Sequence, residues 1–211
     1  MSDRKFDRKK RNSGKRHRNP IMLITGEGKN KTEKLYFNSF NEYHGKYVIR
    51  FANTGLDTDP ARMLKSMKKA WKTYGLSKRD GDKAYIVLDM DCNPQKMQQI
   101  KELQKTTDDI QFIISNPCIE IWFILHFSYT THQFKDSKEP KKELTRYIPE
   151  YTESRDISNE LRTHLEDASE NVLKLKKHFE SINITWGNAD CNPMTDVPNI
   201  LRELGVLNIE E

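Results

Sequence analysis

The stretch that best predicts the fold of this chain is its first apolar run with the loop that follows, Ile21-Met-Leu-Ile-Thr-Gly-Glu-Gly-Lys-Asn-Lys-Thr-Glu33. Residues 21–25 are short, apolar and bounded by glycine, which is typical of a buried strand that ends in a turn. Glu27 stands between two glycines just beyond that strand. A charged side chain there has no evident packing role, so Glu27 is a candidate functional residue.

Two later segments repeat this pattern of an apolar run followed by acidic residues. They are Ala84-Tyr-Ile-Val-Leu-Asp-Met-Asp91 and Phe112-Ile-Ile-Ser-Asn-Pro-Cys-Ile-Glu120. Side chains alternate along a strand, so Asp89 and Asp91 are expected to leave on the same face. In an open parallel sheet the carboxyl ends of the strands lie on one edge, where ligands bind. The acids expected to meet at that edge are Glu27, Asp89, Asp91 and Glu120.

Four carboxylates at one edge would repel one another unless a cation neutralised them. Clustered oxygen ligands select hard divalent ions, so the sequence predicts a site for Mg2+ or Mn2+. Any one of these acids could instead be a solvated loop residue or a charge that the helix dipole favours at a helix start. Glu33 has two interpretations: it completes a second metal site, or it occupies the first turn of a helix over residues 32–43.

Strand and helix patterns alternate over residues 21–127, which predicts an α/β fold with a mostly parallel sheet of four strands flanked by helices. Three predicted helices begin at Asp59-Pro60, Asn93-Pro94 and Asn116-Pro117, where a capping side chain precedes a proline. Asn192-Pro193 repeats the pair. The predicted strands are 21–25, 47–52, 83–89 and 110–114, and the predicted helices are 32–43, 60–74, 94–105 and 117–127.

The chain becomes polar and helical after residue 128, which divides it into a core over residues 20–127 and a helical extension over residues 128–211. Apolar residues of the extension are spaced alternately four and three apart, the pattern of a helix face packed on another helix. They are Leu161, Leu165, Ala168, Val172, Leu175, Phe179 and Ile182. A last helix over residues 194–205 ends at Gly205 and is expected to pack back on the core.

Composition favours a soluble, cytoplasmic protein without a membrane partner. The chain has 211 residues, 32% of them charged, and no apolar segment approaches the roughly 20 residues that a membrane-spanning helix needs. Its three cysteines are odd in number and far apart, as expected in a reducing compartment. They lack the CxxC pairs typical of a zinc site, and each lies beside an Asn-Pro pair.

Residues 1–19 carry most of the positive charge. They contain nine Lys or Arg against two Asp, a net charge of +7, which leaves −2 for the rest of the chain. The segment has no periodic apolar residues, so we expect a disordered tail that orders on a polyanion, with nucleic acid as the natural partner. A solubilising tail is the alternative. The cations within it include Arg8, Lys9, Lys10, Arg11, Lys15 and Arg16.

Several other motifs are missing from the sequence. A GxxxxGK[ST] loop would need glycine where Asn30 stands, and a GxGxxG loop would need it at Lys31. His126 lies in an apolar helix and is interpreted as a core histidine. Ser115 and Cys118 have no partners at the spacing of a catalytic triad.

Four motifs in order resemble the RloB-like family, and the resemblance covers nearly all the chain after residue 20. They are Gly26-Glu-Gly-Lys-Asn-Lys-Thr-Glu-Lys-Leu-Tyr-Phe37, Asp89-Met-Asp91, Ser115-Asn-Pro-Cys-Ile-Glu-Ile-Trp-Phe-Ile-Leu-His-Phe127 and Asn192-Pro-Met-Thr-Asp-Val197. More broadly, Glu27 with Asp89 and Asp91 is similar to the signature of the Toprim superfamily, a glutamate after the first strand and an Asp-x-Asp after a later one. RloB-like proteins resemble Toprim nucleases of the overcoming-lysogenisation-defect type, which implies a Toprim or Rossmann-like fold.

This resemblance implies a Mg2+- or Mn2+-dependent nuclease of DNA or RNA. Glu27, Asp89 and Asp91 would bind one metal. Glu120 and Glu33 would bind a second, although Glu33 stands six residues after Glu27, where the related nucleases usually have four. The residues that would steady the phosphate are Lys29, Lys31 or Lys34.

The resemblance also implies a biological setting. RloB-like proteins are encoded among bacterial phage-defence genes, often beside an ABC- or AAA-type ATPase, so a role in abortive infection with such a partner is expected. A non-enzymatic alternative is a subunit that binds metal or nucleotide at the sheet edge and docks on an ATPase through its helical extension.

Overall fold

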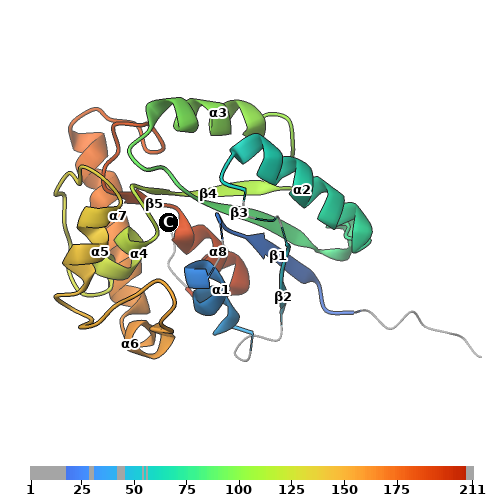
Figure 1. Ribbon diagram of the computed structural model, residues 1–211, viewed down its shortest axis with the longest axis horizontal. Coiled ribbons are helices and arrows are strands. Elements are labelled where there is room, and N and C mark those ends of the chain that lie inside the picture. Colours follow the sequence, from blue (N-terminus) through green and yellow to red (C-terminus); the bar gives the residue numbers. More distant parts are fainter. Residues whose placement is uncertain (1–17, 29–30, 42–45, 54, 56, 208–211) are drawn as a thin grey trace, which may run out of the picture.

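The computed structural model describes residues 18–28, 31–41, 46–53, 55 and 57–207. These residues form an α/β fold around an open sheet with the strand order β2-β1-β3-β4-β5 (Figure 1). The strands are β1 (Ile21–Thr25), β2 (Val48–Phe51), β3 (Lys83–Asp89), β4 (Gln111–Asn116) and β5 (Met194–Thr195). The first four are parallel to their neighbours, and β5 pairs antiparallel with β4. The α/β class and the mostly parallel sheet are confirmed.

The sheet of the described residues has five strands, so the prediction of four is wrong by one edge strand. β5 is only two residues long, and it lies inside the segment that was predicted as the start of the last helix. A two-residue strand shows no alternation, so no local pattern could reveal it. Backbone pairing of Ser115 with Thr195 defines this strand.

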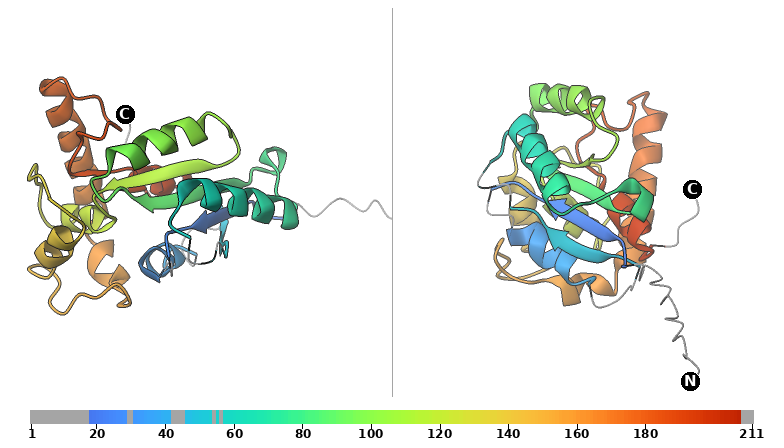
Figure 2. Two further views of the ribbon diagram at one scale, coloured as in Figure 1. Left: turned by 45° about the horizontal axis from the view of Figure 1, so that its top comes forward. Right: turned by 90° about the vertical axis from the view of Figure 1, so that its right-hand side faces the viewer.

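Helices cover both faces of the sheet and its carboxyl edge. One face carries α2 (Pro60–Thr73) and α3 (Pro94–Gln104), and the other carries α1 (Lys31–Asn38) and α8 (Val197–Leu204) (Figure 1). Four more helices gather beyond the carboxyl ends of the parallel strands (Figure 2). They are α4 (Glu120–Leu125), α5 (Lys138–Leu144), α6 (Ser158–Arg162) and α7 (Leu165–Ser181). A short 3-10 helix spans Lys78–Asp80.

The hydrophobic core extends from the sheet into the helical extension through α4. Every residue of Glu-Ile-Trp-Phe-Ile-Leu in α4 is buried, and this helix packs against both α5 and α7. Val172, Leu175 and Phe179 of α7 are buried, as the spacing predicted, while Ile182 lies beyond the helix end and is half-exposed. The predicted continuous apolar face is divided between α6 and α7, because the chain turns between residues 162 and 165.

Two of the four predicted proline-adjacent caps are confirmed. The side chain of Asp59 accepts a hydrogen bond from the backbone N–H of Arg62, and that of Asn93 accepts from two N–H groups at the start of α3. Asn116 and Asn192, in contrast, do not start helices, and both precede cis proline bonds. Asn116 ends β4 and connects distant segments, because it accepts from the N–H of Cys92 and donates to the carbonyl oxygen of Cys191.

The start of β1 is held by an ion pair from the segment predicted as a tail. The guanidinium of Arg18 donates two hydrogen bonds to Asp82, at 2.5 and 2.7 Å. The buried carboxylate of Asp82 also accepts from the N–H groups of Ile21 and Ser77.

Across the described ranges, no helix combines the length and apolar character that crossing a bilayer would need.

Candidate functional site

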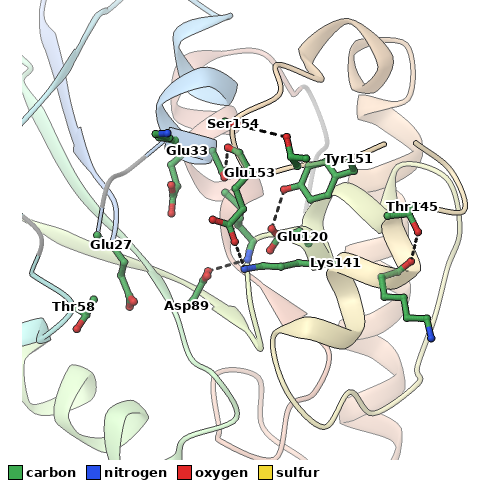
Figure 3. A pocket seen from close by; sticks show the side chains of 16 residues that line it. Glu27, Glu33, Thr58, Asp89, Glu120, Lys141, Thr145, Tyr151, Glu153 and Ser154 are labelled. Carbon is green, nitrogen blue, oxygen red and sulfur yellow. Dashed lines mark hydrogen bonds and ion pairs between the residues drawn. The ribbon is translucent and has the colours of Figure 1, made fainter. Parts of the chain in front are cut away.

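A pocket of about 790 Å³ opens at the carboxyl ends of β1 and β3 (Figure 3). From β1 the chain passes to β2 on one side, and from β3 it passes to β4 on the other. The pocket therefore lies where the connections of the sheet reverse, which is the usual ligand position in such folds. Its charged lining residues are Glu27, Glu33, Asp89, Glu120, Glu153, Lys31, Lys141 and Lys142. The pocket thus contains four of the five predicted acidic site residues, and Asp91 does not line it.

Asp89 is the last residue of β3 and connects that strand to α4. Its Oδ1 accepts a hydrogen bond of 2.9 Å from the backbone N–H of Ile119, the residue before α4. Burial raises the pKa of Asp89 well above its ordinary value, and the negative charges of Glu33 and Glu120 raise it further. The carboxylate form of Asp89 is therefore disfavoured until a positive charge approaches.

Glu120 is the first residue of α4 and is almost completely buried. Its Oε1 accepts a hydrogen bond of 2.9 Å from the hydroxyl of Tyr151 (Figure 3). Its Oε2 is also buried but has no partner among the residues that the structure describes. A buried acceptor without a partner costs free energy, typically about 1–3 kcal/mol. This oxygen is therefore available to a ligand of the pocket.

Glu33 occupies the first turn of a helix, which is one of the two interpretations that the sequence left open, and its role as a metal ligand stays a prediction. It lies in the first turn of α1, and it also lines the pocket with only 7% of its surface exposed. Burial raises the pKa of Glu33 to about 7, and repulsion by Glu120 and Glu27 adds to the effect. Glu33 is therefore part of the same electrostatic cluster as the acids at the strand ends.

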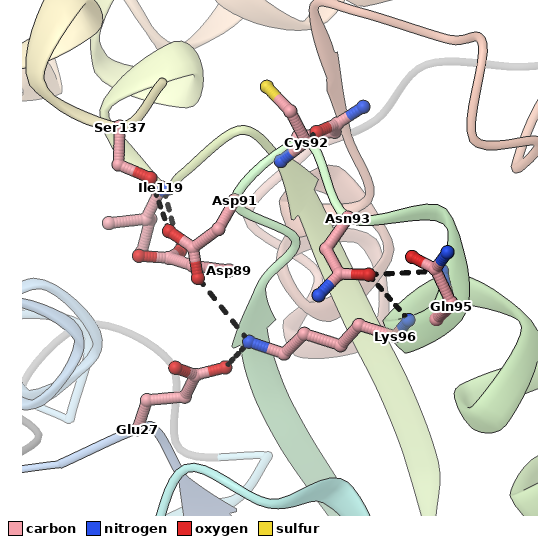
Figure 4. Close-up of polar contacts among 10 residues, drawn as sticks. Glu27, Asp89, Asp91, Cys92, Asn93, Gln95, Lys96, Ile119 and Ser137 are labelled. Atoms are coloured by element: carbon pink, nitrogen blue, oxygen red, sulfur yellow. Dashed lines mark hydrogen bonds and ion pairs between the residues drawn. The ribbon is translucent and has the colours of Figure 1, made fainter. Parts of the chain in front are cut away.

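Asp91 differs from Asp89 because β3 ends between them. Asp91 has a positive φ of 52°, so the alternation expected along a continuous strand does not extend to it. Its Oδ1 accepts a hydrogen bond from the hydroxyl of Ser137, and its Oδ2 lies 3.5 Å from Nζ of Lys96 (Figure 4). The same ammonium group contacts Oε1 of Glu27. Lys96 therefore connects Glu27 and Asp91 as a shared cation.

The donor chemistry of this region fits a hard divalent cation. Among the residues that the structure describes, no three acidic, histidine or cysteine side chains are arranged as a complete metal site. The pocket nevertheless offers carboxylate oxygens, one of them buried without a partner in the described ranges. Burial together with neighbouring charges raises the pKa values of Glu33 and Asp89. Oxygen ligands of this kind suit Mg2+ or Mn2+. The acids of the pocket lining that could contribute ligands are Glu27, Glu33, Asp89 and Glu120.

The predicted phosphate-binding lysines lie in different places. Lys31 is exposed and lines the pocket, whereas Lys34 is exposed on α1 and does not line it. The remaining predicted cations lie outside the described residues, and they are Lys29, Arg8, Lys9, Lys10, Arg11, Lys15 and Arg16.

The helical extension contributes residues to the pocket that the sequence did not predict, among them Lys141, Tyr151 and Glu153. Lys141 pairs with Glu153 at 2.5 Å, and Tyr151 holds Glu120. Burial favours the neutral amine of Lys141, but the hydrogen bond to Glu153 and the charge of Glu120 raise the pKa of Lys141 overall. Residues 138–154 show no motif in the sequence. Only their position beside α4 identifies them.

His126 lies in the core, and the three cysteines form no disulfide with one another. His126 is buried, its Nδ1 lies 2.8 Å from the carbonyl oxygen of Trp122, and burial lowers its pKa to about 3. It is therefore a neutral core histidine, as predicted. Cys92, Cys118 and Cys191 are free cysteines.

Comparison with known proteins agrees with this geometry. The model of a family described as RloB-like protein matches residues 22–204, a range that runs from the second residue of β1 to the end of α8 and contains the pocket. No curated protein and no solved structure matches the chain. Because the family match covers most of the sequence, this chain belongs to the RloB-like family.

Proposed function

We propose that this protein is a divalent-metal-dependent nuclease that hydrolyses phosphodiester bonds of nucleic acid in the pocket at the carboxyl ends of β1 and β3. The observation that carries the proposal is the buried Oε2 of Glu120, which has no partner in the described part of the chain, beside Asp89, whose pKa is strongly raised. A buried cluster of carboxylates is costly without a counter-charge, and a divalent cation would supply it. Perturbed acids in a pocket are also typical of functional sites.

Four side chains of the pocket would hold the metal: Glu27, Glu33, Asp89 and Glu120. A bound Mg2+ or Mn2+ would lower the pKa of an attacking water and stabilise negative charge on the phosphoryl oxygens. Hydrogen bonds from Tyr151 and from the Ile119 N–H would orient Glu120 and Asp89. The chain's main contribution would thus be to keep these ligands in place.

Cations of the pocket would bind the substrate phosphate. Lys141 and Lys31 both line the pocket, and Glu153 holds the ammonium group of Lys141 at 2.5 Å. An ammonium group is a compact point charge that suits phosphate oxygens. Glu153 would therefore act as a positioning residue for Lys141.

The basic segment over residues 1–19 supports nucleic acid as the substrate class, because its net charge is +7. Deleting residues 1–17 would leave the Arg18 ion pair with Asp82 intact. Each lysine or arginine that neutralises a phosphate contributes about 0.9 to the salt dependence of binding to duplex DNA. The truncated protein should therefore bind DNA with a shallower salt dependence. An unchanged slope would make the segment a solubility feature.

A second candidate is a non-catalytic subunit, favoured by the contact of Lys96 with both Glu27 and Asp91. This ammonium group already neutralises two of the acids without a metal. Such a subunit would bind nucleotide or metal in the pocket and dock on an ATPase.

A role in phage defence with an ABC- or AAA-type ATPase is likewise a proposal, supported by the resemblance to RloB-like proteins.

The deciding experiment is incubation of the purified protein with labelled DNA and RNA in Mg2+, in Mn2+ and in a chelator, with and without a neighbouring ATPase. We expect cleavage that requires metal and that is lost in Asp89→Asn but kept in the control Asp190→Asn, an exposed acid outside the pocket. Retention of the ATPase without any cleavage would favour the non-catalytic subunit. Cleavage by Asp89→Asn at the wild-type rate would refute the site.

A further inference from the structure

Helix α2 presents a row of lysines on one face. Lys65, Lys68, Lys69 and Lys72 follow the spacing i, i+3, i+4, i+7, which brings residues to one side of a helix. The opposite side of α2 is buried through Met63, Leu64 and Met67. The segment Pro60–Thr73 contains no acidic residue. We call these four lysines the α2 lysine face.

These lysines are not compensated within the described part of the chain. Lys65, Lys69 and Lys72 are exposed and have no hydrogen bond or ion pair to any residue that the structure describes. Lys68 donates to the carbonyl oxygen of Thr106 at 3.3 Å. Arg62, at the start of the same helix, instead lies 3.6 Å from Asp57. The charge of the α2 lysine face is therefore open to a partner.

A row of like charges is unfavourable for the helix itself. Like charges at i, i+4 destabilise a helix, and both Lys65 with Lys69 and Lys68 with Lys72 stand four apart. A solvated helix face usually mixes acidic and basic residues, which would stabilise it through i, i+4 pairs. Helix stability therefore does not explain this arrangement, whereas binding of a polyanion does.

Shallow grooves run along the α2 lysine face. One of about 510 Å³ is lined by all four lysines together with Leu103 and Thr106 from the region of α3. Another of about 500 Å³ is lined by Lys68 and Lys72 with the half-buried Trp71, and also by Asp108 and Asp109. Asp109 is paired with Lys78 at 3.4 Å. Figure 2 shows α2 and α3 side by side on the outer face of the sheet.

The amino end of α2, five residues before Lys65, lies close to the candidate site. Thr58 lines the site pocket, and α2 starts two residues later at Pro60. Lys65 and Lys72 are separated by about 10 Å along the helix axis, at about 1.5 Å per residue. That distance equals the axial rise of about three base pairs of a duplex, at about 3.4 Å each. The row of lysines is therefore long enough to contact more than one phosphate of a nucleic acid.

We propose that the α2 lysine face binds the sugar-phosphate backbone of the nucleic acid whose scissile bond lies in the pocket at the carboxyl ends of β1 and β3. This inference rests on the proposed nuclease function and adds the path of the substrate over the protein. The proposed contact is electrostatic, because lysine ammonium groups pair with phosphate groups. It is independent of base sequence, because phosphates are the same at every nucleotide.

The test compares two triple variants of the full chain, each also carrying Asp89→Asn so that the probe stays intact. One changes Lys65, Lys69 and Lys72 to Gln. The control changes Lys174, Lys176 and Lys177 of α7 to Gln, which removes the same charge from another helix. Binding of a labelled DNA duplex is measured by fluorescence anisotropy over a salt series. The α2 variant should lose about 2–3 from the slope of log affinity against log salt, and the control should lose much less.

Two further arms make the result decisive. Changing the same three α2 lysines to Arg keeps their charge and should restore the slope, with unchanged circular dichroism for all variants. Equal slopes for the α2 variant and the control, or no binding by the wild type, would overturn the proposal. In a competition arm, polyglutamate and unlabelled DNA are added at equal charge concentration. Equal displacement of the probe by the two competitors would also overturn the proposal, because this result would indicate an acidic protein partner.

Failure of the nuclease function is detected separately. Hydrolysis of bis(p-nitrophenyl) phosphate by the wild type in Mn2+ probes the pocket without the α2 lysine face, because this ester has a single phosphate. No hydrolysis there, combined with the expected loss of slope in the α2 variant, would leave a nucleic-acid-binding face on a protein that is not a nuclease.

Discussion

Tyr151 donates a hydrogen bond of 2.9 Å to Glu120, and this contact joins the helical extension to the first residue of α4. The phenol can donate only one proton, so it serves Oε1 of Glu120 and leaves the buried Oε2 without a partner among the described residues. The arrangement fixes the position of the carboxylate while keeping one oxygen for another ligand.

We predict that Glu120→Gln abolishes turnover and leaves the protein folded. The amide keeps the acceptor for Tyr151 but removes the negative charge that would bind metal, so activity should fall by orders of magnitude and Mn2+ affinity should weaken. Isothermal titration and cleavage assays measure the two effects. Glu180→Gln on the exposed part of α7 is the control. Wild-type Mn2+ affinity in Glu120→Gln would reduce Glu120 to a structural role.

Tyr151→Phe should behave differently. In the metal-free protein this change leaves both oxygens of Glu120 without a partner among the residues that the structure describes, which should cost about 1–3 kcal/mol of the free energy of unfolding. Saturating Mn2+ should recover more stability in this variant than in the wild type. Chemical denaturation with and without Mn2+ measures the difference. A variant as stable as the wild type without metal would contradict this account.

Asp89→Asn should remove activity while stability holds or rises. Burial and the charges of Glu33 and Glu120 disfavour the carboxylate of Asp89, and asparagine keeps an acceptor for the N–H of Ile119. The melting temperature without metal at neutral pH checks this expectation. A large drop in melting temperature would mean that the charge of Asp89 stabilises the fold, contrary to the repulsion described above.

Lys96→Met should make the protein more dependent on metal. Lys96 contacts Glu27 and lies 3.5 Å from Asp91, so its removal leaves two acids without their shared cation. The metal-free variant should lose about 1–3 kcal/mol of stability, and Mn2+ should bind more tightly because it no longer competes with the ammonium group. Lys101→Met on the same helix is the matched control. Unchanged Mn2+ affinity would exclude Lys96 as a competing cation.

The stability of the metal-free protein should fall as the pH rises through neutrality. Burial raises the pKa of Glu33 from 4.5 to about 7, so the folded protein holds this proton more tightly than the unfolded chain does. Its contribution is therefore complete below about pH 4.5 and is lost as the pH rises through about 7, by at most about 3 kcal/mol. Glu33→Gln should flatten the decline in urea denaturation between about pH 5 and pH 8. An identical pH profile in this variant would contradict the assignment.

The elements best predicted from the sequence are those whose signals are local. The strands at residues 21–25 and 83–89 have the predicted bounds because each is a continuous apolar run between turn residues, as expected for central parallel strands. Asp59 and Asn93 cap α2 and α3 because capping needs only the next few residues. The acids that follow these strands were recognisable for the same reason.

Elements that depend on distant pairing were mispredicted. β5 exists only because Met194 and Thr195 pair with β4, and two residues carry no periodic signal. Asn116 has the same neighbours in sequence as a helix cap, but its side chain instead contacts Cys92 and Cys191. An asparagine before proline is compatible with both roles, so its distant partners decide between them.

By itself the sequence determined the fold class, the order of the central elements and the acids that lie at the strand ends, because hydrophobic period and capping act over a few residues. Only the tertiary structure decided what those acids contact. Tyr151 reaches Glu120 across 31 positions, Ser137 reaches Asp91 across 46, and Lys96 reaches Glu27 across 69. Such contacts arise when packed elements bring distant side chains together, and no local pattern encodes them.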